Sequence, residues 1–302
     1  MSTEVKLSDE LAEVHHLLTT VGDYLPVDER PEMERFREAG RKWSGQFPVP
    51  DEAVVTQAQG FPGLTVTTPA SRADRVLLYF YGGGYNAGEP YIYRGLAARL
   101  ATAAGAVVHL LDYPRAPENR FPAALDSALA AYKSLLATVG ADRIAVGGDS
   151  AGGGLTLALL LKLKAEGIAL PAAVVPISPW TDMTVSAPSY TELADRDPFV
   201  SAAMLQGFAA GYLVDHDPRD PLVSPLFGDL AGLSPIHIEV GTEETMIDDS
   251  RRFHEKALAA GNSSELVVVE GAPHMLQLFA GIAPEAAESV ERIGSFVRKH
   301  IG

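Results

Sequence analysis

The spacing of apolar and polar residues changes about fifty residues into the chain. Over residues 8–23 apolar side chains recur every three or four positions, which predicts an amphipathic helix. A second polar-faced helix is predicted over residues 30–43, and Pro26 and Pro31 separate the two. From about residue 51 apolar and polar residues alternate instead, which is typical of strands.

Beyond this point short apolar runs alternate with helical segments. The pattern predicts strands around Val54 and Val66 and at 75–80, 106–111, 143–146, 172–177, 236–240 and 265–269, and helices at 122–138, 151–166, 248–260 and 284–300. Strands that alternate with helices in this way predict an α/β fold, with a mostly parallel sheet and helices on both faces.

Residues 181–225 interrupt this alternation. The segment contains five prolines and one helical stretch, residues 201–213. An irregular insertion after a core strand is the usual form of a lid over a site in an open α/β sheet. We therefore predict a core at 51–302 with a cap formed by the insertion at about 181–225 and the N-terminal helices of residues 1–50. An elaborated surface connection is the alternative.

Composition excludes several classes of function. The 24 Lys+Arg and 39 Asp+Glu residues give a formal net charge of −15, which would repel a nucleic-acid backbone. The chain has no cysteine, so disulfides, thiolate catalysis and iron–sulfur clusters are excluded. The start of the chain lacks the pattern of a signal peptide, and the apolar stretch Leu155 to Leu163 is half the ~20 residues that span a membrane. We expect a cytoplasmic protein that does not bind membranes.

Gly148-Asp-Ser-Ala-Gly152 matches the pattern G-x-S-x-G, which is a weak signal by itself. Its position is informative, because it follows the predicted strand 143–146 and begins the predicted helix 151–166. A strand–turn–helix with flanking glycines is what a nucleophile elbow requires. Ser150 is therefore the candidate nucleophile, and a glycine-rich turn with an incidental serine is the alternative.

Three successive glycines, residues 82–84, directly follow the predicted strand 75–80. Their backbone N–H groups can converge on an anion, as an oxyanion hole requires. A phosphate-binding nest or a flexible turn would have the same sequence. The run lacks the G-x-G-x-x-G spacing of a dinucleotide-binding loop.

These motifs occur in a specific order. The blocks are Tyr81–Gly84, Asp112-Tyr113 with Ala116–Glu118 and Phe121–Ala124, and Gly148–Gly153. Together they resemble the hormone-sensitive-lipase-like esterases, the bacterial family IV carboxylesterases of the α/β-hydrolase fold. The resemblance extends from about residue 75 to 285.

The resemblance implies a triad in the chain order serine, acid, histidine. Ser150 would be the nucleophile, and His274, in the loop after strand 265–269, would take its proton. The family's acidic position corresponds to Glu244, which we favour, and Asp248 is the alternative.

The other histidines fit other surroundings. His109 and His237 lie within predicted strands and are expected in the core or at its rim, whereas the rest are expected on the surface: His15, His16, His216, His254 and His300. Asp215-His216-Asp217 is interpreted as a polar loop rather than a metal site.

The resemblance also implies an oxyanion hole formed by the backbone N–H groups of Gly83, Gly84 and Ala151. The chain departs from the family at two places. Tyr81 replaces the usual histidine before the glycines, and Pro114-Arg115 replaces the usual Arg-Leu. The family's histidine organises the loop, and the Tyr81 hydroxyl could do the same.

We therefore predict a serine hydrolase that acts on short- to medium-chain acyl esters through an acyl-enzyme, without a metal or organic cofactor. The candidate substrate-binding residues are Tyr85, Phe199, Met204 and Phe208, together with Trp180 and Met275. Its partner would be a small-molecule ester.

Several alternatives share this sequence pattern. A lactone or amide hydrolase would use the same triad, an acyl transferase would need an acceptor site in the cap, and a non-catalytic receptor on this fold would be expected to lack a triad member. The family includes dimers, so a homodimer is also compatible with the sequence.

Overall fold

The computed structural model describes residues 8–25 and 32–302, so the predicted breaks at Pro26 and Pro31 lie outside the described residues. Its eight-stranded sheet has the order β1-β2-β4-β3-β5-β6-β7-β8. The strands are β1 Val54–Gln57, β2 Gly63–Thr67, β3 Arg72–Phe80, β4 Ala106–Leu111, β5 Ile144–Asp149, β6 Ala173–Ile177, β7 Ile236–Gly241 and β8 Ser264–Val269. Pairing is antiparallel at β1–β2 and β2–β4 and parallel from β4 onward, which confirms the mostly parallel sheet.

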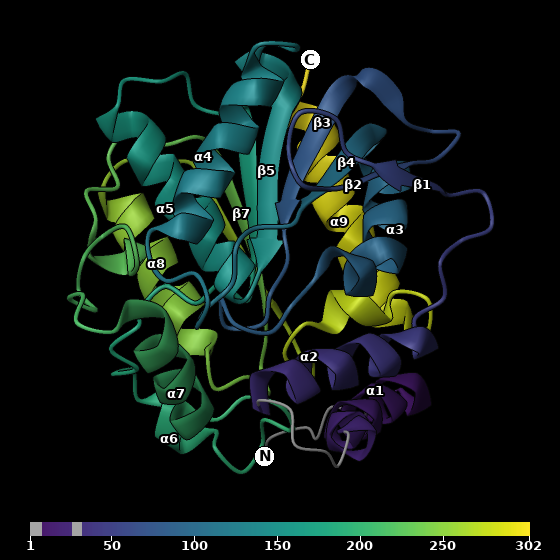
Figure 1. The fold of residues 1–302 in the computed structure, drawn as a ribbon, viewed down its shortest axis with the longest axis vertical. Helices are drawn as coiled ribbons and strands as arrows, with labels where there is room; N and C mark the ends of the chain where they lie inside the picture. The colour runs from purple at the N-terminus through teal and green to yellow at the C-terminus, as the bar shows by residue number, and fades with distance from the viewer. Residues whose placement is uncertain (1–7, 26–31) are drawn as a thin grey trace, which may run out of the picture.

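Helices cover both faces of this sheet. The α-helices of the described residues are α1 Asp9–Thr19, α2 Glu32–Trp43, α3 Arg94–Ala104, α4 Ala123–Leu136, α5 Ala151–Ala165, α6 Ser189–Glu192, α7 Ala202–Leu213, α8 Ile247–Ala259 and α9 Pro284–His300. Figure 1 shows α3 and α9 on one side of the strands and α4, α5 and α8 on the other. The fold is the predicted α/β arrangement.

Short 3₁₀ helices connect or extend several of these elements: η1 Thr20–Tyr24, η2 Ser44–Gln46, η3 Pro90–Tyr93, η4 Ala141–Arg143, η5 Pro225–Phe227 and η6 Leu276–Phe279. The predicted helix at 8–23 is therefore α1 continued by η1. Ser8 caps α1, because its hydroxyl accepts a hydrogen bond from the Leu11 N–H at 3.0 Å.

The sequence pattern did not predict α3 or α6. In α3 nearly every residue is buried, and the helix is rich in alanine. Its polar positions are few, Arg94, Arg99 and Thr102, and the buried remainder is mostly alanine and glycine, which give a weak apolar signal. Helix α6 has a single turn and presents too few residues for any period.

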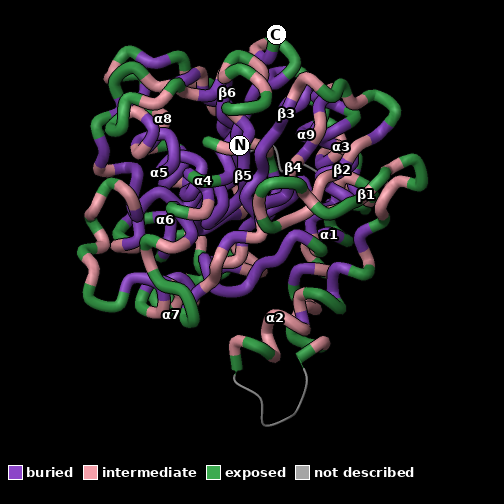
Figure 2. Tube along the Cα trace, turned by 45° about the horizontal axis from the view of Figure 1, so that its top comes forward, coloured by how far each residue is buried: buried purple, intermediate pink, exposed green. Residues whose placement is uncertain are grey.

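The core is continuous through the centre of the sheet. Every residue of β5, β6 and β7 is buried, and Figure 2 shows the same for most of α5. Parallel strands that are covered on both faces have near-continuous apolar sequences for this reason. Each large apolar side chain so buried contributes about 1.5–3 kcal/mol of transfer free energy.

The carboxyl ends of β3, β5, β7 and β8 lie at one edge of the sheet, because these strands run parallel. The loops that follow them carry, respectively, the three glycines, Ser150, Glu244 and His274. Helices α1, α2, α6 and α7 gather at this edge in Figure 1. The N-terminal helices and the 181–225 insertion thus lie together over the predicted site.

The turn from β5 into α5 holds Ser150 in a conformation with φ 54° and ψ −121°. The Ser150 N–H donates to the Ile177 carbonyl at 2.9 Å, and its carbonyl accepts from Gly154 and Trp180. A Cβ atom at Gly152 would lie 1.9 Å from the Phe80 carbonyl oxygen, which no side chain tolerates. This glycine lets α5 begin directly against the end of β3.

Replacing this glycine should therefore destabilise the whole protein. We expect Gly152→Ala to lower the free energy of unfolding by about 1–3 kcal/mol or more, because the backbone of β3 must move. Gly207→Ala is the control, since Gly207 lies within α7 with no atom within 4 Å of a Cβ there. It should raise the free energy of unfolding by about 0.5–1 kcal/mol. Urea denaturation measures both, and equal effects would contradict the packing argument.

Candidate active site

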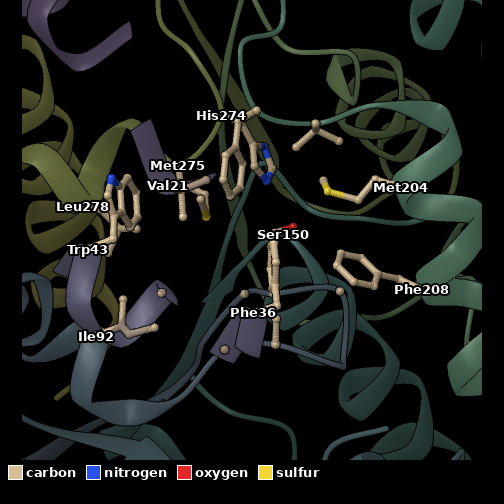
Figure 3. A pocket seen from close by; sticks show the side chains of 18 of the residues that line it. Val21, Phe36, Trp43, Ile92, Ser150, Met204, Phe208, His274, Met275 and Leu278 are labelled. Carbon is tan, nitrogen blue, oxygen red and sulfur yellow. The ribbon is translucent and has the colours of Figure 1, made fainter. Parts of the chain in front are cut away.

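A cavity that opens to solvent lies between the carboxyl edge of the sheet and the cap. Ser150 and His274 face this space, with α2 on one side and α7 on the other (Figure 3). The remaining walls are mostly apolar and include Val21, Phe36, Trp43, Ile92, Met204 and Phe208. A pocket with few polar groups in an apolar wall is typical of small-molecule sites.

The carboxylate of Glu244, whose two oxygens both make hydrogen bonds, orients His274. The Glu244 Oε2 lies 2.7 Å from His274 Nδ1. Its Oε1 accepts hydrogen bonds from the Ser178 hydroxyl at 2.7 Å and from the Gly241 N–H at 2.5 Å. Because Nδ1 is engaged, Nε2 is the imidazole nitrogen left to exchange a proton within the cavity.

Of the two acids that the sequence left open, only Glu244 contacts the histidine. Asp248 lies in α8 and instead accepts hydrogen bonds from the Ser189 N–H at 3.2 Å and from Arg251 at 3.3 Å. Glu243 points toward the cap, where Arg196 pairs with it. The geometry therefore favours Glu244 over Asp248.

The surroundings of His274 stabilise its protonated form. Burial alone would lower the pKa of His274, but the hydrogen bond and negative charge of Glu244, with the charges of Asp197 and Asp149, outweigh it and raise the pKa. A base of this kind is well suited to take a proton at neutral or slightly basic pH.

Asp149, which directly precedes Ser150, links the serine turn to the glycine loop through hydrogen bonds. Its carboxylate accepts hydrogen bonds from the hydroxyls of Tyr79 at 3.0 Å and Tyr93 at 2.8 Å and from the Gly82 N–H at 3.2 Å. Burial raises the pKa of Asp149 to about 6, although these donors and His274 oppose the shift. The sequence analysis missed this residue, and an acidic residue ending an apolar strand was the available signal.

The backbone of the glycine loop leaves N–H groups free to bind an anion. The Gly83 carbonyl accepts from the N–H groups of Asn86 at 3.0 Å and Ala87 at 2.8 Å. Because a trans peptide directs its N–H opposite to its carbonyl, the Gly84 N–H points away from this turn. No described residue accepts a hydrogen bond from Gly83 or Gly84, and Ala151 opens α5, where an N–H has no intrahelical acceptor.

Comparisons with known proteins agree with this geometry. A family model of the α/β-hydrolase fold matches residues 77–278. The chain is 39% identical to an acetyl-hydrolase of Streptomyces hygroscopicus, covering 100% of this chain and 98% of that one. It is 35% identical to an esterase of Acinetobacter venetianus, covering 78% of each. A crystal structure of an esterase from the bacterial hormone-sensitive lipase family superimposes with a TM-score of 0.93 at 40% identity, covering 99% and 100% of the two chains.

The chain belongs to the bacterial hormone-sensitive-lipase family of α/β-hydrolase-fold esterases. It is therefore a hydrolase. A hormone-sensitive lipase from a metagenome library has the same fold, with a TM-score of 0.91 at 35% identity over 99% of this chain and 100% of that one.

Tyr81, which stands where this family usually has histidine, is bound into the loop that it precedes. Its hydroxyl donates toward Asp112 Oδ1 at 3.2 Å and the Tyr113 carbonyl at 3.3 Å. Its ring stacks on Tyr113 with centroids 4.3 Å apart, and the Tyr113 hydroxyl donates back to the Tyr81 carbonyl at 2.7 Å. The tyrosine hydroxyl thus ties the residue before the glycines to the segment Asp112-Tyr113.

Not every predicted pocket residue lies in the cavity. Phe199, Met204, Phe208 and Met275 line it. The prediction for Tyr85 was wrong, because its ring is buried in the core and stacks on Tyr212 with centroids 4.2 Å apart.

Trp180 is also absent from the cavity wall. It is fully buried, and its indole N–H donates to the Asp182 carbonyl at 3.1 Å. Helix α2 supplies Phe36 and Trp43 instead, and Trp43 stacks on Phe199 at 6.3 Å. Their seven-residue spacing, which places them on one helix face, was the sequence signal for this wall.

The remaining histidines lie outside the cavity. Burial lowers the pKa of His109 to about 4, and His109 contacts the Thr65 hydroxyl at 2.9 Å. His237 contacts two carboxylates, and His216 pairs with Asp220 at 2.7 Å. His15, expected on the surface, contacts the Gly271 carbonyl at 2.8 Å and so links α1 to the loop of His274.

Residues 8–25 and 32–302 contain neither a metal-binding cluster nor a membrane-spanning helix. No group of three or more His, Asp or Glu side chains there has an arrangement that could hold a metal ion. In the same residues no helix combines the length and the apolar character that crossing a membrane requires.

Mutation can distinguish the roles of Glu244 and Asp248. We expect Glu244→Gln to lower kcat by about 10²- to 10⁴-fold, because the imidazole loses its orienting charge. Activity is lost as pH falls through the raised pKa of His274, so this variant should also move the acidic limb of kcat/KM to lower pH. Asp248→Asn is the control and should leave both unchanged. An equal loss in Asp248→Asn, measured by initial rates from about pH 5 to 9, would overturn the assignment.

Proposed function

We propose that this protein is a serine carboxylesterase that hydrolyses short- to medium-chain acyl esters through an acyl-enzyme. The observation that carries the proposal is the Glu244–His274 pair, joined at 2.7 Å, beside Ser150 on a strained strand–helix turn. A serine hydroxyl is a weak nucleophile unless an adjacent base takes its proton. This arrangement provides the base and the group that orients it.

In the first half-reaction His274 takes the Ser150 hydroxyl proton as the oxygen attacks the acyl carbon. The carbonyl π electrons move onto the oxygen, and a tetrahedral intermediate forms. When the intermediate collapses, the bond to the alcohol oxygen breaks and His274 returns the proton to that oxygen. In the second half-reaction water replaces the alcohol, and His274 takes its proton and then restores the hydroxyl of Ser150 as the acid leaves.

The negative oxygen of the intermediate would bind to the N–H groups of Gly83, Gly84 and Ala151. Donors that are fixed in advance do not have to reorganise when the charge develops, and each is worth about 10²- to 10³-fold in kcat. The α5 helix also begins at this point, and its N-terminal end favours negative charge.

The cavity favours a modest apolar ester as the substrate. Its walls bear almost no polar side chain besides Ser150, His274 and Tyr93, so a charged acyl or alcohol group would lose its solvation without compensation. The relatives named acetyl-hydrolase and esterase fit this substrate class. The rings of Phe36 and Phe208, 6.4 Å apart, narrow the space between α2 and α7 and limit chain length.

Hydrolysis of p-nitrophenyl esters from C2 to C12 tests the nucleophile. We expect Ser150→Ala to lower kcat by several orders of magnitude, because no acyl-enzyme can form. Ser250→Ala is a matched control, since the Ser250 hydroxyl is buried without a hydrogen-bond partner among the described residues. It should retain full activity. Retained hydrolysis in Ser150→Ala would refute the mechanism, and a wild type active only on lactones or amides would refute the substrate class.

Chain-length preference can be tested at the wall formed by α7. Met204 lines both the cavity and an outer groove between α2 and α7. We expect Met204→Ala to shift the preferred acyl chain to a greater length, because the two spaces then join. Met183→Ala makes the same change at a buried cap residue outside the cavity, and its preference should equal that of the wild type. Identical profiles in the two variants would show that this wall does not limit the chain.

A further inference from the structure

The loop after the three glycines contains a buried amide that joins two parts of the site. Asn86 is 2% exposed. Its Nδ2 donates to the Gly84 carbonyl at 2.6 Å and to the Phe208 carbonyl at 3.2 Å. One side chain thus links the glycine loop to helix α7 of the cap.

Both partners of this amide are carbonyl oxygens, so only a group with two donors satisfies them. A carboxylate at this position would face two acceptors and repel them. On the other side a Cβ at Gly211 would lie 3.1 Å from the Asn86 Oδ1, so the glycine leaves α7 close enough for the contact.

The second cap helix meets the same residue. The Arg37 Nε of α2 donates to the Asn86 carbonyl at 2.7 Å, and its Nη2 donates to the Ala116 carbonyl at 2.7 Å. Glu118 pairs with the same guanidinium in a two-pronged contact at 2.9 and 2.8 Å. Helices α2 and α7 and the glycine loop therefore converge on Asn86.

The peptide that carries the Gly84 N–H is held through the Gly83 carbonyl, which accepts from the Asn86 and Ala87 N–H groups. On the carbonyl side of Gly84, the Asn86 amide donates the one hydrogen bond found among the described residues. Gly84 adopts φ 61°, a conformation that glycine can leave at little cost, so this second hold restrains its backbone. The Phe208 ring packs directly on it, since a Cβ at Gly84 would lie 2.1 Å from a ring carbon. Helix α7 thus holds Gly84 through the ring of Phe208 and through the amide that binds the Phe208 carbonyl.

We propose that Asn86 is a positioning residue for catalysis, which ties the Gly84 carbonyl to α7 and so restrains the backbone that directs the Gly84 N–H toward the acyl oxygen. The inference rests on the proposed function, because it assigns the Gly84 N–H to the negative oxygen of the intermediate.

Loss of the Asn86 amide should affect kcat more than KM. Asn86 does not line the cavity, so substrate binding should change little. Removing an oxyanion donor outright costs about 10²- to 10³-fold, and a donor that is present but mobile should cost less. We expect Asn86→Ala to lower kcat by about 10- to 100-fold with KM within about threefold.

The chain contains a matched control for this change. Asn262 is 9% exposed, and its Nδ2 also donates to two carbonyl oxygens, those of Leu230 and Ala257, far from the cavity. Asn262→Ala removes two such hydrogen bonds and also the one that its Oδ1 accepts from the Leu233 N–H at 2.9 Å, so it should lose at least as much thermal stability as Asn86→Ala. Only Asn86→Ala should lose kcat.

The experiment measures kcat, KM and Tm of both variants with p-nitrophenyl butyrate. If Asn86→Ala does not fold, Asn86→Asp, which keeps the shape of the side chain, replaces it in the experiment. Asn86→Asp should lower kcat at pH 8 by at least the roughly 10- to 100-fold expected of Asn86→Ala. Equal kcat in the Asn86 and Asn262 variants, or a change in KM alone, would overturn the inference. If Ser150→Ala still hydrolyses the ester, the proposed function is wrong. If Ser150→Ala is inactive and Asn86→Ala is fully active, only the inference about Asn86 is wrong.

Discussion

The site depends on the close packing of two strand ends beneath Ser150. Gly152 lies directly against the Phe80 carbonyl, so the turn into α5 and the loop after β3 cannot shift independently. Asp149 ties the same two segments through the Gly82 N–H. Because these contacts fix the serine turn and the start of the glycine loop, the sheet sets the backbone positions of Ser150 and Gly82, and Asn86 adds the link from Gly84 to the cap.

The cap completes a site that the sheet alone leaves open. Its segment at 196–200 is anchored on either side of Glu244, where Arg196 pairs with Glu243 and the Asp197 carboxylate accepts hydrogen bonds from Thr245. Apolar rings from α2 and α7 line the space above. Electrostatic interactions such as the one between Glu244 and His274 are stronger in such apolar surroundings than in water.

Much of the site could be predicted because parallel strands bring sequence-distant loops to one edge. Ser150 follows a predicted strand in the G-x-S-x-G pattern, whereas Glu244 and His274 were assigned through the resemblance to the hormone-sensitive-lipase-like esterases. Side chains in the cap were harder to place. Tyr85 directly follows the glycines, yet the orientation of its ring depends on packing against Tyr212. The part of the cavity wall that α2 supplies depends on contacts between residues far apart in the sequence, such as Trp43 and Phe199. Helix α3 escaped prediction because its buried positions are mostly alanine, whose small side chains give a weak apolar pattern.

The central claim is that an acyl group is carried transiently by the Ser150 oxygen. The most direct test is to mix the enzyme with a p-nitrophenyl ester, quench in acid within milliseconds and determine by peptide mass spectrometry where the acyl group is attached. The account predicts an acyl adduct on the peptide that contains Ser150, and no adduct in Ser150→Ala. An adduct on another residue, or a burst of p-nitrophenol that persists in Ser150→Ala, would contradict it.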